Sequence, residues 1–450
     1  MQFKLSVTEE EDAKKKFVIS FRITKAIILG ILATAIALMF IWANKEKLLE
    51  VYTLKGEFVY GKDNSQFYLM GKAIQQGLNP YTNLSELAKI WMPKWTPHPF
   101  PCPYPPFVAL LCVPLAEIPI HTLVWYWAFI DFTFLVTMVL LLWKWWGSKM
   151  NILWFPVVLS LLLLCESVHR ELRGGQIVGF LACLFVLTWL SAKDGKNILA
   201  GLLLGIILSI KIIAWPLVLC LLLCRKWISS AISIIVFGIS NMLALYYLGL
   251  NTVLDYYTRV SKFSVDFWGG YQDNMALSAW GKRLFSGIGW GCYIQPVYKF
   301  PALVPMFNIL IPFTVFLIIF YMMTRTKSFD TRFGLACFAS VLLSPVIWIF
   351  YFLLLAVPIC LLYKRLLQHQ ASTELWILTI IPTALLYCPA QSWFIYATAF
   401  GFGPQKSITF NSGLLTLMPI FAMFWLLWVF WQTDKLERSM ATSKYALIES

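Results

Sequence analysis

The chain has 450 residues, of which 60% are hydrophobic and only 13% are charged, and its formal net charge is +14. Soluble domains contain about 45–50% apolar and about 25% charged residues, so this composition excludes a soluble protein and predicts an all-α polytopic membrane protein. Lys and Arg concentrate in connections between apolar segments, where the positive-inside bias explains the net charge without a nucleic-acid partner.

The apolar segments predict about twelve transmembrane helices in a multi-pass protein of the cell membrane. Residues 1–25 are too charged for a cleaved signal peptide and are expected to form a cytoplasmic tail, as are residues 433–450. With both termini inside, the basic connections also fall on the cytoplasmic side. The expected spans are residues 26–44, 122–143, 152–167, 176–191, 198–210, 213–224, 229–248, 302–323, 333–346, 349–363, 374–390 and 411–431.

Two long apolar runs have to be divided to reach this topology. Residues 200–224 carry Lys211 in their middle, and residues 333–363 carry Ser344-Pro345. A Lys at the bilayer centre costs about 2.5–3.5 kcal/mol on insertion scales, and Pro disfavours a straight helix. We therefore expect each run to form two short helices that meet at the outer face.

Three long extracytoplasmic segments are predicted within this single membrane domain, at residues 45–121, 249–301 and 391–410. The first is expected to contain two helices that lie on the membrane surface, over residues 64–76 and 84–91. The apolar segment 104–118 that follows them fits either a full span or a re-entrant segment.

A set of polar residues lies at the outer face under this topology. An Asp beside Arg and Lys suits transfer from a lipid phosphate, because cations stabilise the departing phosphate and a carboxylate accepts the proton of the attacking hydroxyl. Simpler readings stay open: a helix cap for Asp63, a snorkelling side chain for Lys211, and a solvated loop flank for the Arg residues. The set comprises Asp63, Arg170, Glu171, Arg173, Gln176, Lys211, Asp266, Asp273, Asn274, Arg283 and Tyr351.

Short motifs occur in a fixed order between residues 60 and 365: Asp63 with Phe67-Tyr68; Gly77-Leu78-Asn79-Pro80-Tyr81; Tyr104-Pro105-Pro106; Pro114-Leu115-Ala116; Gly175-Gln176; Ala200-Gly201, Gly205, Lys211 and Pro216; Asn274, Ser278 and Arg283; and Ser344-Pro345-Val346-Ile347-Trp348. In these motifs the chain resembles glycosyltransferase family 87, a mannosyltransferase-like family of the GT-C superfamily. Each motif alone is short, and their order makes the resemblance specific.

The resemblance implies a GT-C-type bundle that transfers a hexose, expected to be mannose, from a polyprenyl-phosphate sugar with inversion, on the extracytoplasmic side. The acceptor would be a lipid-linked glycan or glycolipid, with membrane lipids as surroundings and neither metal nor cofactor required. Asp63 would be the catalytic base, and Lys211, Arg170, Arg173 and Gln176 would bind the donor phosphate. Substrate contacts would come from Phe67, Tyr68, Tyr81, Tyr104, Asn274, Arg283, Trp348 and Tyr351.

The chain departs from the family pattern at one turn. The family usually has one or two His just after Ser-Pro-x-x-Trp, whereas Trp348 is followed here by Ile349-Phe350-Tyr351. Any function of that His would pass to Tyr351 or to another residue. Two other classes stay open, a transporter or flippase of lipid-linked sugars and a non-catalytic assembly subunit. A transporter would tolerate loss of Asp63 better than a transferase would.

Overall fold

The computed structural model describes most of the chain, and no strand occurs among the described residues. Most of the first predicted span, much of 152–167 and all of 391–410 lie outside this description. The described ranges are 63–147 without 94–96 and 98, 165–286 without 270 and 272–273, 298–387 and 418–449, with isolated positions at 28, 31, 32, 35, 39, 158, 159, 162, 163 and 296.

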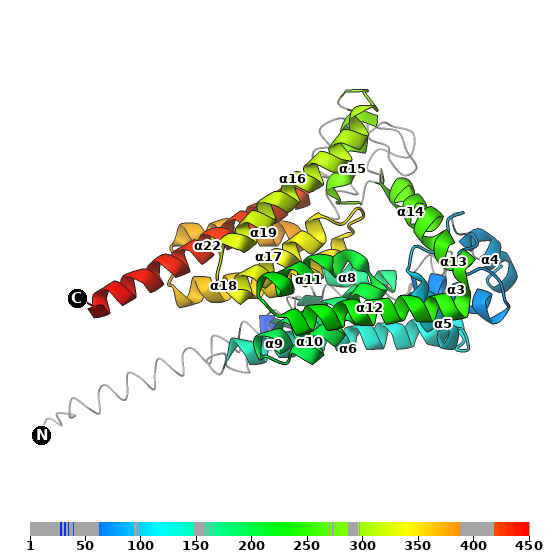
Figure 1. The fold of residues 1–450 in the computed structure, drawn as a ribbon, viewed down its shortest axis with the longest axis horizontal. Helices are drawn as coiled ribbons and strands as arrows, with labels where there is room; N and C mark the ends of the chain where they lie inside the picture. Colours follow the sequence, from blue (N-terminus) through cyan, green and yellow to red (C-terminus); the bar gives the residue numbers. More distant parts are fainter. Residues whose placement is uncertain are drawn as a thin grey trace, which may run out of the picture.

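The described helices form two packed groups (Figure 1). In the first group α10 packs against α9 and α12, and α9 packs against α6. In the second group α17 packs against α16, α18 and α22, and α19 lies against α22. The bounds are α6 (Ile120–Trp146), α9 (Val178–Lys193), α10 (Asn197–Ile210), α12 (Trp227–Leu248), α16 (Leu303–Arg325), α17 (Phe329–Leu342), α18 (Ala356–Gln368), α19 (Thr373–Tyr387) and α22 (Met418–Glu449).

Four of the described helical stretches are long and apolar enough to cross a membrane: Ile120–Trp146, Trp227–Leu248, Leu303–Arg325 and Ile349–Gln368. Shorter apolar helices of 10–17 residues accompany them, including α9, α10 and α19. At 1.5 Å per residue these reach about 15–25 Å, against about 30 Å of hydrocarbon. The structure therefore supports a helical membrane protein, and the predicted number of about twelve spans goes beyond what these lengths establish.

Both predicted helix breaks are confirmed. The helix α10 ends at Ile210, Lys211 is extended with φ −148° and ψ 121°, and η3 (Ile212–Ala214) and α11 (Trp215–Leu223) follow. In the second run, α17 ends at Leu342, and the turn at Ser344-Pro345 leads into η6 (Ile349–Leu355) and then α18. Both breaks place non-helical backbone at the wall of a cavity.

The first predicted outer loop contains two short helices at the expected places, α3 (Asp63–Gln75) and α4 (Leu84–Trp91), followed by α5 (Pro106–Leu115). Most residues of α3 are buried, so this helix packs inside the protein, whereas it was expected to lie on the membrane surface. With 10 residues, α5 reaches about 15 Å, so it is too short to span the bilayer alone, and the re-entrant reading of 104–118 fits better. The helices α3 and α5 pack closely because α3 has Gly71 at the contact. A Cβ there would lie 2.2 Å from the carbonyl oxygen of Cys112.

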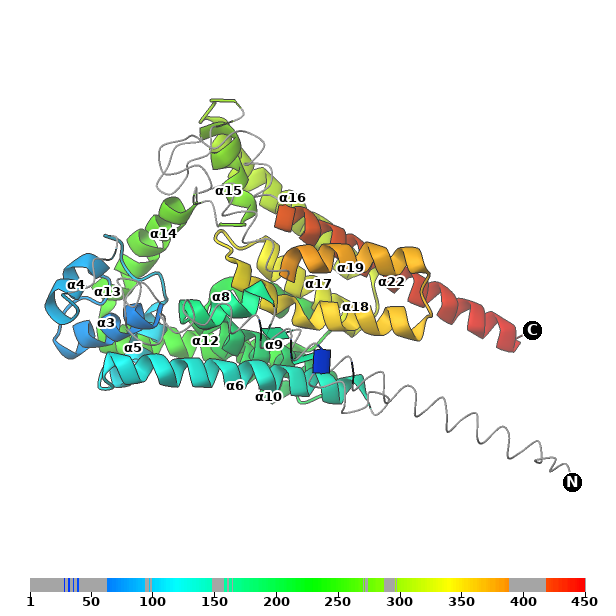
Figure 2. The ribbon, with the colours of Figure 1, turned by 180° about the vertical axis from the view of Figure 1, so that it is seen from behind.

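Basic helix ends gather at one end of the molecule. Lys193 pairs with Asp330 at 2.5 Å, Lys226 donates to the carbonyl of Ala192, and Lys364 lies 3.7 Å from the ring centroid of Trp145. The helices α3 and α4 lie at the opposite end (Figure 2).

Candidate active site

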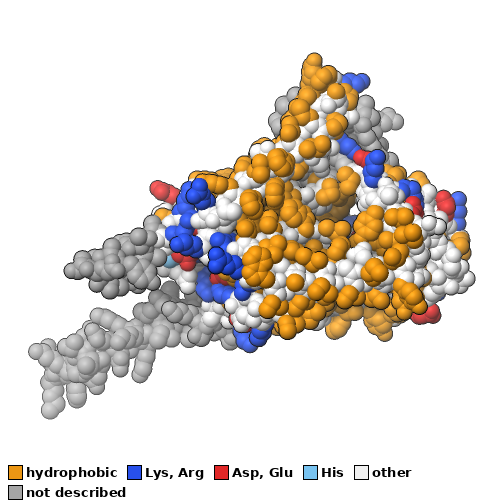
Figure 3. Space-filling view, in the orientation of Figure 1, with side chains coloured by type: hydrophobic (Ala, Val, Ile, Leu, Met, Phe, Trp, Pro, Cys, Tyr) orange, Lys and Arg blue, Asp and Glu red, His pale blue; other side chains and the backbone are white. Residues whose placement is uncertain are grey.

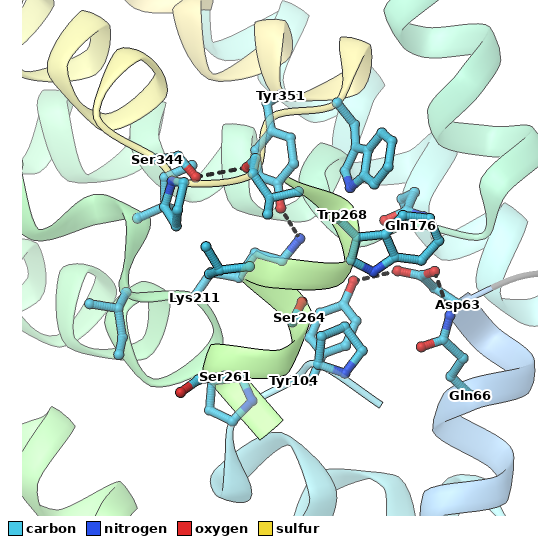
Figure 4. A pocket seen from close by; sticks show the side chains of 18 of the residues that line it. Asp63, Gln66, Tyr104, Gln176, Lys211, Ser261, Ser264, Trp268, Ser344 and Tyr351 are labelled. Atoms are coloured by element: carbon cyan, nitrogen blue, oxygen red, sulfur yellow. Dashed lines mark hydrogen bonds between the residues drawn. The ribbon is translucent and has the colours of Figure 1, made fainter. Parts of the chain in front are cut away.

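A cavity of about 720 Å³ opens between the segment from α3 to α5 and the two helix breaks. Its walls come from α3, the Pro-rich segment before α5, the Lys211 break, the turn at Ser344-Pro345 and α14 (Ser261–Trp268), which follows α13 (Leu250–Asp255) and the π-helical segment η4 (Tyr256–Val260). The polar and aromatic side chains that line it include Asp63, Gln66, Tyr104, Gln176, Lys211, Ser261, Ser264, Trp268, Tyr271, Ser344, Trp348 and Tyr351 (Figure 4).

Asp63 lies in the first turn of α3, so its carboxylate sits at the positive end of the helix dipole. The hydroxyl of Tyr104 donates to Oδ2 at 2.6 Å, and the amide of Gln66 donates to Oδ1 at 3.1 Å. Burial raises the pKa of Asp63, while Tyr104, the positive charge of Lys211 and the amide of Gln176 each act to lower it. A carboxylate of raised pKa is a stronger proton acceptor, as a general base needs.

Lys211 faces the same cavity from the break between α10 and η3. Its Nζ donates to the hydroxyl of Tyr351 at 2.7 Å and lies 5.0 Å from the ring centroid of Tyr104. Tyr104 therefore contacts both charged groups, binding the carboxylate of Asp63 through its hydroxyl and Lys211 through its ring. Lys211 and Asp63 thus share the cavity, and no direct salt bridge joins them.

The Gly175-Gln176 pair brings α8 (Glu166–Gly174) and α9 up to Asp63. Gly175 adopts the left-handed conformation with φ 59°, and a Cβ there would lie 2.9 Å from the side chain of Asn64. The indole of Trp127 donates to the carbonyl of Gln176 at 2.7 Å, which holds the turn in place. Glycine is needed at this position both for its backbone angle and for the close approach to α3.

Three aromatic side chains form one wall of the cavity. The ring centroids of Trp268 and Trp348 lie 5.3 Å apart, and Tyr271 lies 5.3 Å from Trp268 and 5.6 Å from Trp348. Such edge-to-face packing fixes the rings, so the wall is a preformed apolar surface against which a sugar face or a lipid chain fits.

Asn274 and Arg283 lie behind this wall rather than among the lining residues. Asn274 is fully buried, and its Oδ1 accepts the backbone N–H groups of Ala276 and Ile347 at 3.0 and 2.9 Å. Arg283, in the π-helical segment η5 (Lys282–Ser286) after α15 (Leu277–Gly281), donates to the carbonyls of Tyr271 and Asn274, both at 2.6 Å. These two predicted substrate contacts therefore join the loop before α15 to the turn that carries Trp348.

Arg170 and Arg173, predicted to bind the donor phosphate, do not line the cavity. The buried positions of α8 are residues 166–168 and 171, and the two Arg side chains are half-buried beside them. Arg170 forms a salt bridge of 2.8 Å with Glu166. Gln176 and Lys211 are the predicted phosphate-binding residues that reach the cavity.

Phe67, Tyr68 and Tyr81 also lie outside the lining set. Phe67 is buried against Tyr104, with ring centroids 4.7 Å apart, and Tyr81 is buried with its hydroxyl donating to the carbonyl of Tyr104 at 3.0 Å. Tyr68 is half-buried below the ammonium of Lys72. Phe67 and Tyr81 thus hold Tyr104, which in turn contacts Asp63.

Sequence reasoning missed several lining residues. Gln66 follows Asp63 by one helical turn, and Ser261 and Ser264 are spaced at i and i+3 along α14. The spacing that places these residues on one helical face is visible in the sequence. Which helical face lines the cavity depends on tertiary packing, so this spacing identified lining residues only once the structure was known.

The lining residues suit a group transfer that needs a base and a fixed cation. Asp63 supplies the only carboxylate among the described lining residues, and Lys211 the only cation. Nor does any group of three or more potential metal ligands come together within the described part of the chain. A helical membrane protein with such a cavity fits the class of membrane enzymes that transfer a group at the bilayer surface.

The family model of glycosyltransferase family 87 matches residues 103–345, which is more than half of the chain. The chain belongs to glycosyltransferase family 87, and it is therefore a glycosyltransferase that acts on a sugar donor and an acceptor. No curated protein and no solved structure matches the sequence.

Proposed function

We propose that the protein transfers a hexose, with mannose as the first candidate, from a polyprenyl-phosphate sugar to a lipid-linked glycan or glycolipid on the extracytoplasmic side of the cell membrane. The observation that carries the proposal is that Asp63 and Lys211 line the same cavity, with Tyr104 in contact with both. Transfer of a sugar from a phosphate to a hydroxyl is promoted by a proton acceptor and by a group that stabilises the leaving phosphate.

In this mechanism Asp63 accepts the proton of the acceptor hydroxyl as that hydroxyl attacks the anomeric carbon. The bond from the anomeric carbon to the phosphate oxygen breaks on the opposite face, so a single displacement inverts the configuration. Lys211, oriented by Tyr351, stabilises the charge that develops on the departing polyprenyl phosphate. Gln176 lies on the Asp63 side of the cavity and can bind either substrate.

The test is transfer from a panel of synthetic polyprenyl-phosphate sugars into membrane lipids, with the wild type compared with Asp63→Asn at matched expression. A positioned general base contributes about 10²–10⁴-fold, so the variant should lose that factor. Asp266→Asn is the matched control, because Asp266 is an exposed carboxylate of α14. Equal transfer by the wild type and Asp63→Asn would refute the assigned role, and no transfer from any donor by the wild type would refute the donor class.

A further inference from the structure

A second hollow, of about 750 Å³, lies between the C-terminal end of α16 and the middle of α22. It shares no residue with the catalytic cavity. Its lining consists of two residues of α16 and three of α22: Tyr321, Arg325, Trp431, Lys435 and Arg438.

The cations in this hollow lie over aromatic rings. The guanidinium of Arg325 lies 5.0 Å from the ring centroid of Tyr321, one helical turn earlier. Over Trp431, Lys435 lies at 5.7 Å and Arg438 at 5.3 Å, at the i+4 and i+7 positions of α22. Both helices therefore present an aromatic ring followed by basic residues toward one space.

The three cations differ in whether they already form an ion pair within the protein. Arg438 binds Asp434 at 3.0 Å and donates to the backbone carbonyl of Arg325 at 3.0 Å, so it joins the two helices. Arg325 and Lys435 are exposed, and neither forms an ion pair with another residue in the described part of the chain. The hollow thus has two cations available for an anion from outside the protein.

The position of the hollow relative to the membrane indicates which kind of anion it binds. The helix α16 is long enough to span the membrane and ends at Arg325, so Tyr321 and Trp431 occupy the depth where Tyr and Trp mark a membrane interface. One turn before Tyr321, Leu317 and Ile318 are 47% and 52% exposed, as side chains facing acyl chains would be. Lys and Arg side chains gather at this end of the molecule (Figure 3).

We propose that this hollow binds the phosphate of an anionic phospholipid headgroup. Arg325 and Lys435 would pair with the phosphodiester, because guanidinium and ammonium groups bind phosphate oxygens through charge-assisted hydrogen bonds. The acyl chains would lie along Leu317 and Ile318. Bound in this way, the lipid would link α16 to α22 at the membrane surface.

The test uses the purified, delipidated full-length protein in detergent and measures titration with phosphatidylglycerol by native mass spectrometry and by thermal stability. Phosphatidylcholine and inorganic phosphate are titrated in parallel. The double variant Arg325→Gln/Lys435→Gln should bind phosphatidylglycerol about 30-fold more weakly and lose its thermal stabilisation, because two cations are removed from an anionic headgroup.

The control is Lys89→Gln/Lys299→Gln, which removes the same charge from exposed positions in the first outer loop and before the opposite end of α16. It should bind phosphatidylglycerol like the wild type. Equal affinity of the double variant and the wild type would overturn the proposal, as would phosphatidylcholine binding equally well. Displacement of phosphatidylglycerol by inorganic phosphate at equal concentration would also overturn it, by showing a site for the free anion. If the double variant does not fold, Lys435→Gln alone, about 5-fold weaker by the same reasoning, decides the matter.

Discussion

Substitution of Tyr104 by Phe removes one hydroxyl and leaves the rest of the candidate site in place. The hydroxyl donates to Oδ2 of Asp63 at 2.6 Å, whereas the ring packs on Phe67 and under Lys211. A hydrogen bond to a charged group contributes about 1.5–3 kcal/mol and one to a neutral group about 0.5–1.5 kcal/mol. Loss of the hydroxyl therefore destabilises the ionised carboxylate by about 1–1.5 kcal/mol more than the protonated acid. This difference corresponds to about a 5- to 13-fold increase in the proton affinity of Asp63.

The sign of the pH effect follows from the role of Asp63. A base works in its ionised form, so transfer is lost as pH falls through the pKa of Asp63, which burial already raises. Tyr104→Phe should raise this pKa further. The acid limb of the kcat/KM profile should therefore move to higher pH, with transfer about 5- to 13-fold below wild type on that limb and close to wild type on the plateau.

The assay is a pH series of sugar transfer into membrane lipids by matched amounts of each variant. Tyr81→Phe is the control, because it also removes one buried hydroxyl, which donates to the backbone of Tyr104 and not to Asp63. Its acid limb should coincide with that of the wild type. An acid limb that stays in place in Tyr104→Phe, or moves to lower pH, would contradict the assigned contact, and an equal loss at every pH would make Tyr104 a substrate contact instead.

Three further predictions concern the cation, the wall and the packing of the site. Lys211→Met should lower the rate of single-turnover transfer by about 10²–10³-fold, as loss of a donor that stabilises a developing charge does in other enzymes. Lys211→Arg should recover part of this rate, and equal rates in the Met and Arg variants would exclude a charge effect. Asn274→Ala leaves two buried backbone N–H groups without an acceptor, at about 1–3 kcal/mol each, so thermal unfolding of the purified protein should occur at a clearly lower temperature; an unchanged transition would show that water replaces the side chain. Gly71→Ala should destabilise the protein and lower transfer, because the new methyl group would overlap the backbone of α5; normal thermal stability would show that α3 and α5 separate without loss.

The local features of this fold were predictable because they depend on neighbouring residues. A Lys inside an apolar run and a Ser-Pro pair inside another both interrupt helices, and both breaks occur where expected. The helices α3 and α4 likewise follow from their own residue patterns, with bounds within one residue of those expected. The number of spans was not settled, because short apolar helices look alike in the sequence whether they cross the membrane or not.

The geometry of the site was predictable only in part, because its contacts join residues far apart in the chain. Asp63 meets Tyr104, and Lys211 meets Tyr351 across 140 positions. The resemblance brought these residues into one set, but it did not separate side chains that line the cavity from those that support it. For α8 helical periodicity did not make this separation, because Arg170 lies one turn after the buried Glu166 and pairs with it; its absence from the cavity lining became visible only in the structure.

The turn without His shows how the charge in this cavity is distributed. Phe350 and Tyr351 occupy the positions that follow Trp348, and both line the cavity. A tyrosine hydroxyl accepts the hydrogen bond of Lys211 but cannot add a positive charge of its own, as an imidazolium would. The positive charge beside the leaving phosphate therefore rests on Lys211 in the proposed mechanism, and Tyr351 acts by orienting it. Tyr351→Phe should then lower transfer less than Lys211→Met does, because only one neutral hydrogen bond is lost while the charge remains.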